Sequence, residues 1–132
     1  MARGVPDAMQ MREIKYGAKT TPAAQQQTAA ALLQAGRVAE SLDLSILAGD
    51  DAAVASIRKR ACDEGRPIWL IMIERAHSAI PTDEWRACAE AAFRAERWRD
   101  AFRAFTRADD EAGLERVREK IPGYEIYVPD GK

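Results

Sequence analysis

The side chains with the greatest capacity for chemistry are few in this sequence and stand far apart. His77 is the only histidine, and Glu74 precedes it by three residues, so a helix would place both on one face. A Glu-x-x-His pair of this kind binds iron in four-helix bundles, but only together with a second such pair and further carboxylates. With one histidine in the chain, the number of ligands argues against a metal site.

The remaining nucleophiles have no partner in any recognisable motif. Cys62 and Cys88 form no CxxC pair, and both fall on the inner faces of expected helices, so we interpret them as packed thiols. Ser41, Ser45 and Ser56 have no nearby base, and the chain contains no glycine-rich phosphate loop. We therefore expect a protein that is not an enzyme and has no cofactor. Two unpaired cysteines favour a reducing compartment, either the cytoplasm or an organelle matrix.

Three arginines form the most regular set of charges. Arg99, Arg103 and Arg107 recur every fourth residue, which places them along one face of a helix, opposite Phe102 and Phe105. Guanidinium groups in such a row can bind the carboxylates of a protein partner or the phosphates of a nucleic acid.

The alternative interpretation is a solvated face, with the three arginines in ion pairs with Asp100, Asp110 and Glu111. The net charge of −1 and the pI near 5.9 provide no overall attraction to nucleic acid. Between residues 83 and 120 there are nine basic and ten acidic side chains, so no local excess exists either. Nucleic-acid binding is therefore our second hypothesis, behind protein binding.

The elements that must position these residues are all expected to be helices. Residues 22–122 carry the expected helix signals, with Thr21 and Thr82 as N-caps, Pro22 in a first turn and Gly36 and Gly49 at helix ends. We expect helices at residues 22–35, 38–48, 51–64, 67–80, 82–95, 98–108 and 111–121. The apolar run at residues 68–73 also fits a buried strand, but it continues without a turn signal and so favours a helix.

The chain ends are expected to differ from this helical domain. Residues 1–21 are predicted to form an extended arm, because glycine and proline interrupt them and no helical period develops. Residues 123–132 are predicted to be an extended tail, in which Tyr124 and Tyr127 are candidates for partner contact. The longest apolar run is far too short to span a bilayer.

A shift of 60 residues brings two parts of the sequence into register. Leu33 meets Phe93 and Leu42 meets Phe102, while many alanines and both Asp-Asp pairs also coincide. A Gly-Arg or Glu-Arg link recurs about every 30 residues, at positions 36–37, 65–66 and 96–97. This spacing predicts a short right-handed α-solenoid of about three helical hairpins plus a final helix.

Residues 82–113 resemble a tetratricopeptide repeat. The residues that carry the resemblance are Trp85, Ala89, Ala101, Phe105 and Ala108, which stand at the spacing of that family's signature positions. The resemblance implies a superhelical fold that binds proteins or peptides, and it implies no chemistry. The AAFRAER run at residues 91–97 is also similar to a helical-repeat accessory subunit of cytochrome c oxidase.

These observations together predict an all-α interaction module. We expect it to act as an adaptor or as an accessory subunit of a larger assembly, for example an organellar or respiratory complex. The expected contact surface combines the hairpins with both chain ends, and self-association is an open alternative. The C-terminal hairpin should have the larger core, because its aromatic side chains stand where the N-terminal hairpin has smaller ones.

Overall fold

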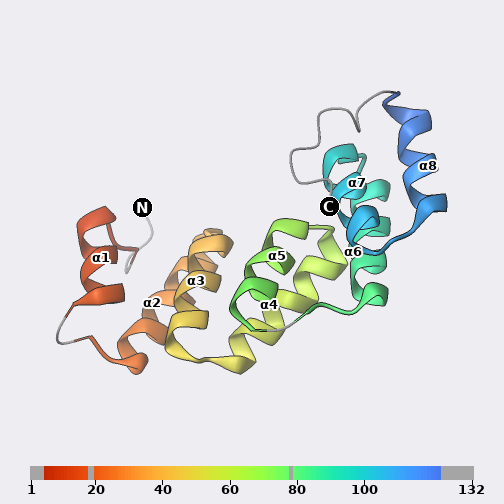
Figure 1. Ribbon diagram of the computed structural model, residues 1–132. Coiled ribbons are helices and arrows are strands. Elements are labelled where there is room, and N and C mark those ends of the chain that lie inside the picture. The colour runs from red at the N-terminus through yellow and green to blue at the C-terminus, as the bar shows by residue number, and fades with distance from the viewer. Residues whose placement is uncertain (1–4, 18–19, 78, 123–132) are drawn as a thin grey trace. The chain divides into compact units, whose positions relative to one another are not determined.

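The computed structural model describes residues 5–17, 20–77 and 79–122, and this part of the chain is all-α (Figure 1). Its helices are α1 Ala8–Tyr16, α2 Pro22–Gln34, α3 Val38–Ala48, α4 Asp51–Glu64, α5 Pro67–Ala76, α6 Thr82–Arg94, α7 Trp98–Arg107 and α8 Glu111–Lys120. The chain divides into two compact units, residues 1–57 and residues 58–132, and the division falls inside α4. Each unit is described separately.

The first unit is organised around the hairpin of α2 and α3. Helix α1 packs against this hairpin by burying Met11 among Ala29, Leu32 and Leu44. The hairpin also buries polar side chains, and these are Gln25, Ser41 and Ser45. The first unit therefore has a small apolar core that includes polar groups.

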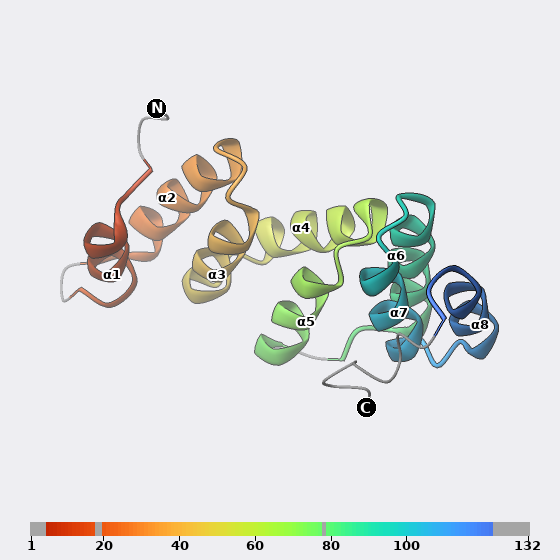
Figure 2. The same ribbon diagram turned by 90° about the horizontal axis from the view of Figure 1, so that it is seen from above.

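The second unit is organised around the hairpin of α6 and α7, with α5 against both helices and α8 against α7. Helix α8 lies on the far side of α7 from α5 (Figure 1, Figure 2). Trp85 and Phe105 are almost completely buried in this hairpin. Their counterparts under a shift of 60 residues are Gln25 and Ser45, so the expectation of a larger C-terminal core is confirmed.

Five helices end in the same type of turn. In each, a residue with φ between 54° and 80° is followed by a residue whose N–H donates to the carbonyl five positions earlier, at 2.9 to 3.0 Å. This is the Schellman arrangement, which provides partners for carbonyls that a helix end leaves free. The residues with positive φ are Gly36, Gly49, Gly65, Glu96 and Asp109. Gly65 is needed for a second reason, because a Cβ atom there would overlap the backbone of Ala92.

The predicted helices between residues 22 and 121 are confirmed, and the run at residues 68–73 is helical. Thr21 caps α2 through a hydrogen bond from the N–H of Ala24, and Pro22 is the first helical residue, as expected. The prediction that Thr82 caps α6 is wrong. Pro81 occupies the cap position, and Thr82 already belongs to the helix. Proline fixes φ of residue 81 at −59°, so the helix starts directly after it.

The prediction of an extended arm over residues 1–21 is wrong for residues 8–16, which form α1. Asp7 and Gln10 explain this helix, because each side chain accepts a hydrogen bond from the other residue's backbone N–H, at 2.8 and 3.0 Å. This reciprocal capping box starts a helix without a long apolar pattern. The predicted tail, with Tyr124 and Tyr127, lies outside the described residues, and the predicted domain bounds stay a prediction.

Within the described ranges, none of the helices has the length and apolar character needed to cross a membrane.

Candidate functional site

The largest hollows on the first unit lie on either side of α1. One, which we call the α1 groove, has a volume of about 540 Å³ and runs between α1 and the start of α3. Its lining residues are Pro6, Asp7, Ala8, Met11, Arg12, Lys15, Tyr16, Arg37 and Glu40. A second cavity of about 550 Å³ borders α1 through Val5, Gln10, Glu13 and Ile14, with Pro6 shared between the two. Helix α1 therefore has accessible space along both sides.

Helix α1 also exposes large apolar side chains. Met9 is 83% exposed and Tyr16 is 73% exposed, and the seven residues between them place both on one helix face. Met11 is the one residue that α1 buries. A helix with one buried apolar residue and two exposed ones presents most of its apolar surface outward.

Polar contacts fix α1 at its C-terminal end. The hydroxyl of Thr20 donates to the carbonyl of Ile14 at 2.5 Å, and the buried amide of Gln25 donates to the same carbonyl at 3.3 Å. The ammonium of Lys15 pairs with the carboxylate of Asp43 on α3. These bonds satisfy helix-end carbonyls and so attach α1 to the hairpin with little apolar contact.

The charges of the α1 groove are mostly positive. Arg12, Lys15 and Arg37 are the described cations of residues 1–57, and all three line it. Arg37 binds Glu40 through two hydrogen bonds of 2.6 and 2.5 Å, which hold the pKa of the Glu40 carboxyl below its usual range. Arg12 is exposed, and within residues 5–17, 20–77 and 79–122 no ion pair involves it. Arg12 is therefore the cation of the groove most available to a partner.

The predicted arginine row on α7 is divided by the packing. Arg107 is half-buried, pairs with Glu74 on α5 and stacks over the ring of Trp85 at 5.3 Å. Arg99 is exposed and Arg103 is partly exposed, and both have polar or electrostatic interactions of their own. The three guanidinium groups therefore do not form one uncommitted row.

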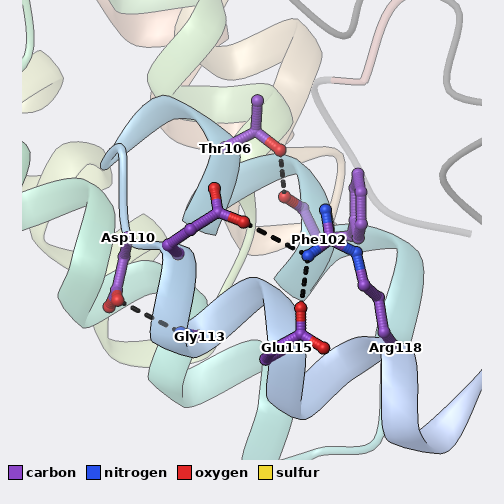
Figure 3. A network of polar contacts seen from close by, with 7 residues as sticks. Phe102, Thr106, Asp110, Gly113, Glu115 and Arg118 are labelled. Carbon is purple, nitrogen blue, oxygen red and sulfur yellow. Dashed lines mark hydrogen bonds and ion pairs between the residues drawn. The ribbon is translucent and has the colours of Figure 1, made fainter.

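The ion pairs that we expected for this row are wrong, because the acids pair with other arginines. Asp100 pairs with Arg97 at 3.4 Å and Asp110 with Arg86 at 3.3 Å. Glu111 pairs with Arg118 at 3.2 Å, and Arg118 also binds Glu115 at 2.7 Å (Figure 3). The choice of partner follows from which helix ends meet, and spacing along one helix does not reveal this.

The expected association of Glu74 with His77 is replaced by the Glu74–Arg107 pair. His77 follows the last residue of α5 and is exposed. In the described part of the chain, no group of three or more histidine, cysteine or acidic residues is arranged to hold a metal ion.

Both cysteines are free thiols that pack against neighbouring helices. The Cys88 thiol is fully buried in α6, and this burial raises its pKa to about 12. The Cys62 thiol is partly buried, and it donates to the carbonyl of Glu84 at 3.6 Å. Burial also raises the pKa of Cys62. A thiol that stays protonated at neutral pH is a poor nucleophile, which agrees with a packing role.

The tryptophans are divided between core and surface. Trp69 and Trp85 are buried, whereas Trp98 is partly exposed beside Phe93, with ring centroids 5.0 Å apart. Arg116 lies 4.3 Å from the Phe93 centroid and pairs with Glu90 at 2.7 Å. This aromatic pair is thus covered in part by α8.

The helix bounds agree under the shift of 60 residues. The agreeing pairs are α1 with α5, α2 with α6, α3 with α7 and α4 with α8. The turns agree as well, because Gly36 and Glu96 share positive φ, as do Gly49 and Asp109. Sequence comparison with known proteins adds no further correspondence, since no protein-family model, curated protein or solved structure matches this chain. The tetratricopeptide resemblance therefore stays a prediction.

Sequence reasoning missed α1 and its groove. The available signal was Asp7 followed three residues later by Gln10, which is the pattern of a capping box. The gathering of Arg12, Lys15 and Arg37 could not be found in the same way, because it depends on α1 docking beside the start of α3.

Proposed function

We propose that this protein is a non-catalytic protein–protein interaction module. It acts as an adaptor or as a structural subunit of a larger assembly, for example an organellar or respiratory complex. The observation that carries the proposal is the exposed surface of α1. This helix is held by hydrogen bonds, is bordered by two cavities and presents Met9 and Tyr16 outward. Exposed apolar side chains beside charged ones are typical of surfaces that bind proteins.

The shared register of the helices supports a repeat architecture for the module. Each hairpin has an apolar face that it cannot bury alone, so neighbouring hairpins cover one another. A right-handed α-solenoid of this kind exposes a face at each end of the stack. The two free thiols favour a reducing compartment.

The polar groups that acid–base chemistry would need support a structural role. The carboxylate of Glu74 is occupied by Arg107, and that of Glu84 accepts two hydrogen bonds of 2.6 Å from Arg58. Other arginine–acid pairs also connect different helices, including Arg116 with Glu90 and Arg86 with Asp110. Charges used in this way position helices against one another.

An affinity pull-down with matched variants tests the proposal. Met9→Gln with Tyr16→Gln removes apolar surface from α1, and Leu47→Gln with Ile68→Gln does the same at two other exposed sites. We expect the wild type and the Leu47/Ile68 variant to retain the same co-purifying proteins, and the Met9/Tyr16 variant to lose them.

Two results would contradict the proposal. One is equal recovery of proteins by both double variants. The other is recovery of nucleic acid with a steep salt dependence that disappears when Arg99, Arg103 and Arg107 are changed to Gln.

A further inference from the structure

Helix α5 shows how a helix in the register of α1 is covered. Trp69 on α5 is 9% exposed, and the guanidinium of Arg60 on α4 lies 5.6 Å from the centroid of its ring. The end of α4 is held nearby, because Arg97 donates to the carbonyl of Glu64 and, at 3.1 Å, to that of Gly65. Helix α4 thus contributes to covering α5, and an arginine of the following hairpin turn binds its last carbonyls.

Helix α1 lacks this cover within the described residues. Met9 is the counterpart of Trp69 under the 60-residue shift, yet it is 83% exposed. Gln10, the counterpart of the fully buried Leu70, is exposed as well. Arg37 is the counterpart of Arg97, with similar φ and ψ values of −92° and 67° against −91° and 81°. It lines the α1 groove where Arg97 would bind a helix end.

Helix α8 is the element that shares the register of α4. Both helices follow a residue of positive φ and start at an aspartate cap. Asp50 accepts a hydrogen bond from the N–H of Ala53 at 3.2 Å, and Asp110 accepts one from the N–H of Gly113 at 3.1 Å (Figure 3). The inner face of α8 buries Leu114 and leaves the opposite face exposed.

The exposed face of α8 is acidic, and the α1 groove is basic. Glu111, Glu115 and Glu119 are all exposed, and their spacing of four residues places them along one side of α8. The groove beside α1 carries Arg12, Lys15 and Arg37. Opposite charges on two surfaces favour their encounter and fix their relative orientation.

We propose that the chain associates head to tail, with α8 of one copy lying against α1 of the next copy. This contact would cover α1 as α4 covers α5, with Met9 against α8 and the three acids facing the basic groove. It rests on the proposed function of α1 as a protein-binding surface. Because the two surfaces differ, the contact is heterologous and joins copies into a ring or an open chain.

Two charge-reversal variants of the full chain separate the two surfaces. Arg12→Glu blocks the α1 surface, and Glu115→Lys with Glu119→Lys blocks the α8 surface. Arg94→Glu reverses an exposed charge on α6 and serves as the matched control. Circular dichroism verifies that each variant keeps its helix content. Sedimentation velocity then measures mass against concentration.

We expect the wild type and the Arg94 control to associate increasingly with concentration, and each blocked variant alone to stay at the 14.6 kDa of one chain. An equimolar mixture of the two blocked variants should give a species of twice that mass and nothing larger, since one usable surface remains on each. A chain carrying all three reversals should associate again, because its reversed surfaces are complementary.

A wild type that stays monomeric at every concentration would overturn this inference, and so would blocked variants that associate as the wild type does. These results are separate from the test of the proposed function. A monomer that still loses its co-purifying proteins on Met9→Gln with Tyr16→Gln would retain that function with a different partner.

Discussion

At the scale of single residues, two buried serines of the first hairpin have opposite environments. The hydroxyl of Ser41 donates to the carbonyl of Ala29 at 2.6 Å, whereas the buried hydroxyl of Ser45 has no hydrogen-bond partner. A buried polar group without a partner lowers stability, and one with a partner contributes modestly to it.

The serines therefore predict opposite effects of the same substitution. Ser41→Ala should lower the free energy of unfolding by about 1 kcal/mol, and Ser45→Ala should raise it by a similar amount. Urea denaturation of each variant measures both changes. Equal destabilisation by the two substitutions would show that Ser45 has a partner in solution.

The Cys88 thiol predicts a loss of stability at alkaline pH. Its ordinary pKa is 9.0, and burial raises it to about 12 in the folded chain. Above pH 9 the unfolded thiol ionises while the folded one stays protonated, so rising pH favours unfolding. The contribution is complete below pH 9 and is lost as the pH rises through about 12.

Urea midpoints measured on both sides of pH 9 check this prediction. Cys88→Ala should lose less stability than the wild type as the pH increases, while Cys62→Ala, which changes the less buried thiol, should remain closer to the wild type. The same pH dependence for the wild type and Cys88→Ala would contradict the account.

At the scale of elements, the arginine of the α6–α7 turn connects two hairpins. Arg97 donates to the carbonyls of Glu64 and Gly65 at the end of α4. Its counterpart Arg37 makes a partly exposed ion pair with Glu40, a type of contact that contributes little. The same residue type in the same kind of turn therefore has unequal structural weight.

This difference predicts unequal costs for matched substitutions. Arg97→Ala should lower the free energy of unfolding by about 2 kcal/mol, because it leaves helix-end carbonyls without a partner. Arg37→Ala should cost less than about 1 kcal/mol. Urea denaturation compares the two, and equal costs would mean that the bonds of Arg97 do not hold the hairpins together.

Most of the helices could be predicted from short-range signals. Thr21 with Pro22, the glycines at helix ends and the aspartate caps before α4 and α8 all act within four residues, so the sequence displays them directly. Helix α1 was missed because only Met11 is buried in it, which leaves no apolar period to detect. The contacts of Arg107 and Arg97 were out of reach, because their partners lie 32 or 33 residues away.

At the scale of the whole molecule, charge is used mainly for internal positioning. The net charge is −1, and arginine–acid pairs connect α4 with α6, α5 with α7 and α6 with α8. Against this background, α1 differs because it combines exposed apolar side chains with a groove lined by three cations. The account therefore assigns partner binding to the N-terminal helix, although the sequence alone directed attention to residues 82–113.

Site-specific photo-crosslinking in cells tests this central claim most directly. Met9→p-benzoylphenylalanine places a reactive group on the exposed face of α1, and the same replacement at Leu47 or Ile68 provides controls of similar exposure. The account predicts that irradiation of the Met9 variant produces a discrete covalent adduct with a second protein chain and that the two controls produce none. No adduct from position 9, or adducts from the control positions instead, would contradict it.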